Sequence, residues 1–101
     1  MPPRPGARDK KIHFLIAGEE LDELKRHAEL LTEAFGLDHR IENYQGKRPI
    51  GFYSWDLDCI LCLEDTLNDD REYPDKNASG YKALERLLRR FRAEYDKNFH
   101  R

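Results

Sequence analysis

The chain of 101 residues contains only two cysteines and has no long run of apolar residues. Cys59 and Cys62 lie three positions apart and provide no disulfide framework of the kind that stabilises small secreted domains. The longest apolar run near the N-terminus covers residues 14–17, which is too short for a secretory signal or a membrane span. We therefore expect a cytoplasmic protein that does not cross a membrane.

The sequence also lacks the motifs of common enzymes. The basic turn at residues 46–48 has neither the glycine spacing nor the following Ser or Thr of a phosphate-binding loop. Ser54 has no nucleophile elbow around it. Asp56 and Asp58 lie two apart, so on a helix they point to different sides and do not form a natural acid/base pair. We therefore expect a non-enzymatic protein that needs no cofactor.

Composition predicts one folded domain. Hydrophobic residues make up 39% of the sequence, charged residues 38% and aromatic residues 11%, which fits a folded chain with a densely charged surface. Residues 1–9 hold three of the five prolines, so we expect a flexible tail there and a single α+β domain over residues 10–101. The core of so short a chain is small, and self-association as a homodimer is expected to add stability.

The charges are distributed unevenly along the chain. The formal net charge is only −2. Residues 1–53 carry nine basic and nine acidic side chains, residues 54–75 one basic and eight acidic, and residues 76–101 eight basic and three acidic. This polarity indicates that oppositely charged surfaces meet, within one chain or between chains.

Two segments have the apolar spacing of amphipathic helices. In residues 19–35 and in residues 81–95, apolar side chains recur at alternating intervals of three and four. Gly36 follows the first segment, where a left-handed C-cap is wanted. Residues 54–68 fit either a strand or a helix, and we predict a helix because Ser54 can cap it and the span is long for one strand.

Three shorter segments favour strands. Residues 11–17 are apolar and partly β-branched, residues 37–45 alternate weakly between apolar and polar, and residues 50–53 form a short piece that Pro49 limits to an edge. Together the elements predict an α+β fold, a small two- or three-stranded sheet covered by three helices. The alternative is a three-helix bundle with residues 11–17 as an extended N-terminal arm.

Aromatic and basic residues gather between the predicted edge strand and the helix that follows. Aromatic and Arg side chains dominate protein interfaces, because they bury large areas at low entropic cost. We therefore expect a contact surface for a protein partner here, although the same residues could instead close the core. The cluster consists of Lys47, Arg48, Phe52, Tyr53 and Trp55.

The last predicted helix offers a basic face opposite its apolar stripe. Such a face could bind nucleic acid, but the pI of about 6.1 and the acidic segment before the helix argue against it. A solvated face that attracts residues 54–75 is the simpler interpretation. The residues concerned are Lys82, Arg86, Arg89, Arg90 and Lys97.

The CxxC pair Cys59 and Cys62 provides a third hypothesis, a small metal or thiol-redox protein. Two thiols three apart on a helix could share a metal or form a redox couple. Their apolar neighbours instead indicate small core residues, because burial hides a thiol and raises its pKa. No second CxxC is present, and the remaining candidates are scattered histidines, of which His27 and His39 fit partly buried structural positions. These histidines are His13, His27, His39 and His100.

Overall fold

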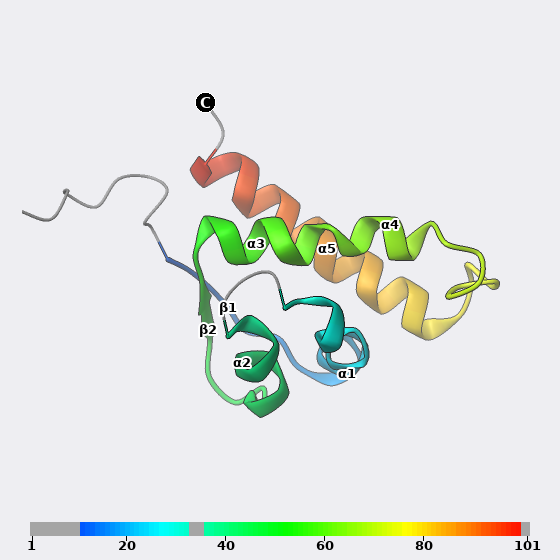
Figure 1. Ribbon diagram of the computed structural model, residues 1–101, viewed down its shortest axis with the longest axis horizontal. Coiled ribbons are helices and arrows are strands. Elements are labelled where there is room, and N and C mark those ends of the chain that lie inside the picture. Colours follow the sequence, from blue (N-terminus) through cyan, green and yellow to red (C-terminus); the bar gives the residue numbers. More distant parts are fainter. Residues whose placement is uncertain (1–10, 33–35, 100–101) are drawn as a thin grey trace, which may run out of the picture.

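The computed structural model describes residues 11–32 and 36–99, which form an α+β fold (Figure 1). The predicted tail, residues 1–9, and His100 lie outside the described residues. In chain order the elements are β1 (Ile12–Phe14), α1 (Gly18–Arg26), the 3₁₀ turn η2 (Ala28–Leu30), α2 (Leu37–Asn43), β2 (Ile50–Phe52), α3 (Ser54–Leu61), α4 (Leu63–Leu67) and α5 (Ser79–Phe99).

The sheet consists of two antiparallel strands in the described part of the chain. Ile12 lies opposite Phe52, and His13 lies opposite Gly51. The predicted strands over residues 11–17 and 50–53 are therefore confirmed in part, at residues 12–14 and 50–52. Because β1 pairs with β2, the alternative of a helical bundle with an extended arm is not the fold observed.

The predicted strand over residues 37–45 is wrong, because these residues form helix α2. Leu37 and Ile41 lie four apart and are both fully buried, whereas the side chain of His39 between them is 77% exposed. A strand would have placed all three on one side of the sheet. Gly36, which we expected to end a helix, has the left-handed φ of 76° but starts α2 as its N-cap.

The first helix is shorter than predicted. α1 ends at Arg26, and the chain turns at His27, whose φ of −106° and ψ of 10° leave the helical region. The single turn η2 follows and keeps Ala28 and Leu31 buried. The turn brings the His27 ring against the hydroxyl group of Tyr73, a contact that sequence periodicity does not indicate.

The predicted helix over residues 54–68 is confirmed, in two pieces. α3 and α4 meet at Cys62, where φ is −62° and ψ is −18°. The N-cap of α3 is Tyr53 rather than the predicted Ser54. The carboxylate of Asp56 accepts a hydrogen bond from the Tyr53 N–H at 3.0 Å, so it satisfies a donor that the helix would leave open.

α5 is the longest helix and organises the core. It packs against α1, α3 and α4, and it crosses behind α3 in Figure 1. Its Phe91 ring lies 4.5 Å from that of Phe14 and 5.6 Å from that of Phe52, which joins the helix to the inner side of both strands. No helix in residues 11–32 or 36–99 combines the length and apolarity needed to span a membrane.

Candidate protein-binding face

The candidate binding face lies on the outer side of the two-stranded sheet. Side chains alternate along each strand, so Phe14 and Phe52 point into the core while Lys11 and His13 remain exposed. The aromatic core lies on the other side of the sheet. Among the described residues, Lys11 and His13 leave the outer side exposed to solvent.

An aromatic stack borders this open side where β2 passes into α3. The Tyr53 and Trp55 rings are stacked with centroids 4.6 Å apart and an interplanar angle of 14°. Trp55 is 47% exposed, so much of its indole faces solvent. The Lys11 ammonium group lies 5.3 Å from the centre of the Tyr53 ring, within the range of a cation–π contact. Cationic and aromatic groups thus adjoin each other here.

Gly51 gives the stem of Lys11 room to cross the sheet. A Cβ atom at position 51 would lie 2.6 Å from Cδ of Lys11 and 3.0 Å from Nε2 of His13. Both distances are shorter than van der Waals contact, so a larger residue would push these side chains away. Because Gly51 has no side chain, the stem of Lys11 can lie across the strand, which places its ammonium group beside Tyr53.

A basic groove continues from this point toward α2. It has a volume of about 440 Å³, and a neighbouring hollow of about 390 Å³ includes Lys47. No carboxylate lines either of them within the described residues. The groove is lined by Lys11, His13, Arg40, Tyr44, Arg48, Pro49, Ile50 and Gly51.

Arg40 links this groove to the start of α3. Its guanidinium group lies 2.7 Å from the carboxylate of Asp56 and donates a hydrogen bond to the Gly51 carbonyl at 3.3 Å. Asp56 is only 1% exposed, so its charge is buried and compensated by Arg40. The one acidic side chain in this contact network therefore adds no negative charge to the face.

The structure divides the five residues predicted for partner contact. Lys47, Arg48 and Trp55 are exposed, and Tyr53 is half-buried against Trp55. Phe52 is fully buried, so it serves the core and not a contact surface.

Three further residues line this face although they were not predicted to do so, Lys11, His13 and Arg40. Lys11 and His13 alternate with the half-buried Ile12 and the buried Phe14 of β1, which was the available signal. Arg40 could not be placed while its segment was expected to be a strand.

The basic residues of α5 are largely paired within the chain. Arg86 and Arg90 both contact Glu20 of α1, at 3.5 and 2.6 Å, and Arg89 contacts Glu85 at 3.5 Å. Among the described residues, only one ion pair joins α5 to the acidic segment 54–75, from Arg92 to Glu64 at 2.7 Å. The other two residues predicted for nucleic-acid binding, Lys82 and Lys97, are exposed and form no ion pair with the described residues.

The two cysteines differ in their surroundings. Cys59 is half-buried against the core, but Cys62 is exposed, so the expected core position is wrong for Cys62. Cys62 lies where α3 ends, and its thiol contacts the Asp58 carbonyl at 3.4 Å. Among the described residues, the only group of three close metal-ligand side chains is Asp38, His39 and Glu42 on α2, which includes neither cysteine.

A buried polar network lies apart from the open face, between α1 and the loop before α5. The Tyr73 hydroxyl donates a hydrogen bond to Oε2 of Glu23, so the Nε2–H of His27 donates to the Tyr73 oxygen at 2.7 Å. All three residues are at most 6% exposed. Burial, together with the charge of Arg26, lowers the pKa of His27, and burial with the bond to Glu23 raises the pKa of Tyr73. Both groups therefore stay neutral at physiological pH.

The lowered pKa of His27 predicts that acid destabilises the fold. Its ordinary pKa is 6.5 and its folded pKa lies below that value, so the stabilisation is present above pH 6.5 and is lost as the pH falls toward the folded pKa. Glu23, Arg26, Glu29, Glu72 and Tyr73 surround it. We expect the unfolding free energy to fall as the pH drops below about 6.5, by at most about 1.4 kcal/mol per pH unit. Urea denaturation at a series of pH values measures this slope.

Two glutamine variants isolate the contribution of His27. His27→Gln keeps an N–H donor for Tyr73 but does not titrate, so its slope should be shallower than that of the unchanged chain. His39→Gln removes a histidine whose side chain is 77% exposed and should leave the slope unaltered. Equal slopes in both variants would show that other groups cause the pH dependence.

Comparisons of the chain with known proteins identify no relative that would indicate its function. No family model matches the chain, and no curated protein or solved structure matches it either.

Proposed function

We propose that the protein is a non-enzymatic binding module that takes an acidic segment of a protein partner on the open side of its sheet. The observation that carries the proposal is the exposed Trp55 stacked on Tyr53, beside a groove lined by cations and by no carboxylate. Exposed aromatic and Arg side chains supply most of the binding energy in protein interfaces. The groove's positive charge would select an acidic segment and steer it toward Trp55.

An acidic protein segment fits this face better than a nucleic acid does. Nucleic-acid affinity arises mainly from several phosphate contacts to unpaired cations. In the groove, Arg40 is already paired with Asp56, whereas Lys11 and Arg48 form no ion pair with the described residues. A peptide needs fewer ion pairs, because apolar side chains can pack on the Trp55 indole.

The single tryptophan provides a direct experiment. The chain contains one Trp, so its fluorescence reports on the proposed face alone. A peptide rich in Glu and Phe should shift the Trp55 emission to shorter wavelength in a saturable way at low salt. Arg48→Glu should weaken this binding about tenfold, because it replaces an attraction in the groove by a repulsion.

The matched control reverses a charge of the same sign elsewhere. Arg89→Glu on α5 changes the net charge equally but lies outside the groove, so it should leave the peptide affinity nearly unaltered. Equal weakening by both variants, or no emission change up to about 1 mM peptide, would reject the proposal. Tighter binding of a single-stranded oligonucleotide than of the peptide would favour a nucleic-acid role instead. A blue shift on raising the protein concentration alone would identify a second copy as the partner.

A further inference from the structure

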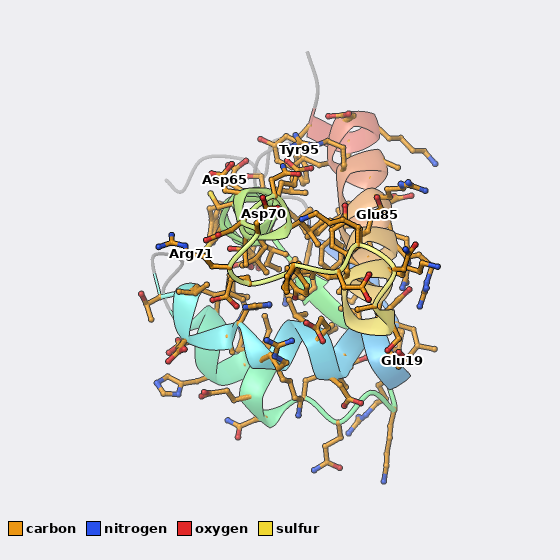
Figure 2. The ribbon with its side chains drawn as sticks, turned by 90° about the vertical axis from the view of Figure 1, so that its right-hand side faces the viewer. Glu19, Asp65, Asp70, Arg71, Glu85 and Tyr95 are labelled. Carbon is orange, nitrogen blue, oxygen red and sulfur yellow. The ribbon has the colours of Figure 1, made fainter. Side chains whose placement is uncertain are left out.

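A second cavity lies far from the open face, where α1, the loop of residues 68–78 and the start of α5 meet. Figure 1 places this loop and the sheet at opposite ends of the molecule, and Figure 2 views the loop end, with Glu19 near the start of α5. The cavity has a volume of about 360 Å³, which suits a small organic molecule. Tyr73, Pro74 and Tyr81 give it apolar and aromatic walls.

The charges around this cavity are almost all negative. Arg26 is the one cationic residue on its wall in the described part of the chain. Arg26 contacts Glu23 at 2.6 Å and Glu72 at 4.0 Å, so its positive charge is already compensated by these two carboxylates. The acidic residues on the wall are Glu19, Asp22, Glu23, Glu72 and Asp75.

Glu23 provides an acceptor that the described residues leave open. Its side chain is 8% exposed, and both Tyr73 and Arg26 bond to the same oxygen, Oε2. The other oxygen, Oε1, accepts no hydrogen bond from the described residues. No fully enclosed side-chain oxygen among those residues lacks a partner, so Oε1 keeps some exposure to solvent, and Glu23 is one of the residues that line the cavity. A partly exposed carboxylate oxygen that accepts no hydrogen bond from the protein can accept one from a ligand that donates an N–H.

The aromatic walls already hold cations from the chain itself. The guanidinium group of Arg26 lies 5.9 Å from the centre of the Tyr73 ring, and the ammonium group of Lys76 lies 5.1 Å from that of Tyr81. These contacts show that the tyrosines accept cationic neighbours at this end of the molecule. Glu19 and Asp22 form no ion pair with any described residue, so their charges remain for a ligand at the mouth of the cavity.

We propose that this cavity binds a small organic cation that carries an amine or guanidine group. The cationic group donates a hydrogen bond to Oε1 of Glu23, its alkyl body lies against Tyr73 and Tyr81, and Glu19 and Asp22 add attraction at the entrance. The site does not depend on the binding face on the sheet, so either assignment can stand without the other.

Agmatine is the probe, titrated at low salt into the full chain while backbone amide shifts are recorded by NMR. We expect saturable binding to one site, with the largest shifts at Gly80 and Tyr81. 1,4-Butanediol has a similar body without the charge and should cause no such shifts. No saturation below about 10 mM agmatine, or equal shifts with the diol, would overturn the proposal. Magnesium ions that reproduce the agmatine shifts would also overturn it, because they would indicate a simple carboxylate cluster.

Two variants test the geometry of the site. Glu19→Gln with Asp22→Asn should weaken agmatine binding about fivefold to tenfold through the loss of two exposed charges. Asp58→Asn with Asp65→Asn makes the same change in net charge away from the cavity, and an equal loss in this control would overturn the proposal.

Gly80→Ala tests the open oxygen without changing any charge. Its methyl group would lie 2.7 Å from Oε1 of Glu23, so it should displace the carboxylate oxygen or close access to it. We expect at least about a fivefold loss of affinity. Amide spectra of the free variant report whether the fold is intact, and unchanged affinity in a folded Gly80→Ala protein would overturn the assignment of Oε1.

Discussion

Replacing Phe52 with alanine is expected to lower the unfolding free energy by about 3–5 kcal/mol, the usual cost of removing a large aromatic side chain from a core. Phe52 is fully buried, and its ring lies 5.6 Å from that of Phe91 and 6.0 Å from that of Phe14. Domains of this size have a total stability of about 5–15 kcal/mol, so the loss is a large part of the whole. Urea denaturation followed by circular dichroism measures it.

Two other substitutions make this result specific. Phe52→Leu keeps most of the buried volume and should cost about 1–2 kcal/mol. Trp55→Ala should cost less than about 1 kcal/mol, because the indole is 47% exposed. A large loss for Trp55→Ala with a small one for Phe52→Ala would mean that the core and contact roles of these aromatic residues are exchanged.

The local sequence cannot separate the roles of Phe52 and Trp55. The two residues lie three apart, but a strand ends and a helix begins between them, so no single period relates their directions. Phe52 points inward because it lies opposite Ile12 on the side of the sheet that packs against α5. That side is buried because Phe14 and Phe91, which are distant in the sequence, pack against Phe52 there. The aromatic cluster was therefore predictable, but its division between core and surface was not.

The segment at residues 37–45 shows a different limit. Leu37 and Ile41 fit a period of two as well as a spacing of four, and so short a segment does not distinguish them. The structure adopts the helix, which places Arg40 beside Asp56 of α3. Helix α5, with apolar side chains repeated over several turns, was predicted correctly because each additional turn strengthens the same period.

Glu23 shows why the loop-end cavity could not be expected from the sequence. In α1 it follows Glu19, Glu20 and Asp22, so it resembles one more solvated acid near the start of a helix. It is buried because Tyr73, fifty positions later, lies over it and donates a hydrogen bond. Contacts over such separations depend on the path of the loop, which local composition does not determine.

Arg40→Met is expected to lower the unfolding free energy by about 2–3 kcal/mol, because it leaves the buried Asp56 carboxylate without its cation. Arg40 is itself 38% exposed in its side chain, so we place the loss below that of a fully buried pair. The midpoint of thermal unfolding should fall by about 10–20 °C, which circular dichroism measures. The methionine keeps the apolar stem of Arg40, so the change tests the charge more than the packing.

The double variant Arg40→Met with Asp56→Asn should recover at least half of that loss. Asparagine can still accept the Tyr53 N–H bond through its side-chain oxygen, and no charge then remains buried. The double-mutant cycle should give a coupling energy of about 1–2 kcal/mol between the two residues. Purely additive effects would mean that the pair contributes nothing beyond its separate contacts. Asp56 caps the helix that carries Trp55, so a measured coupling would show that the Arg40–Asp56 pair stabilises the start of α3.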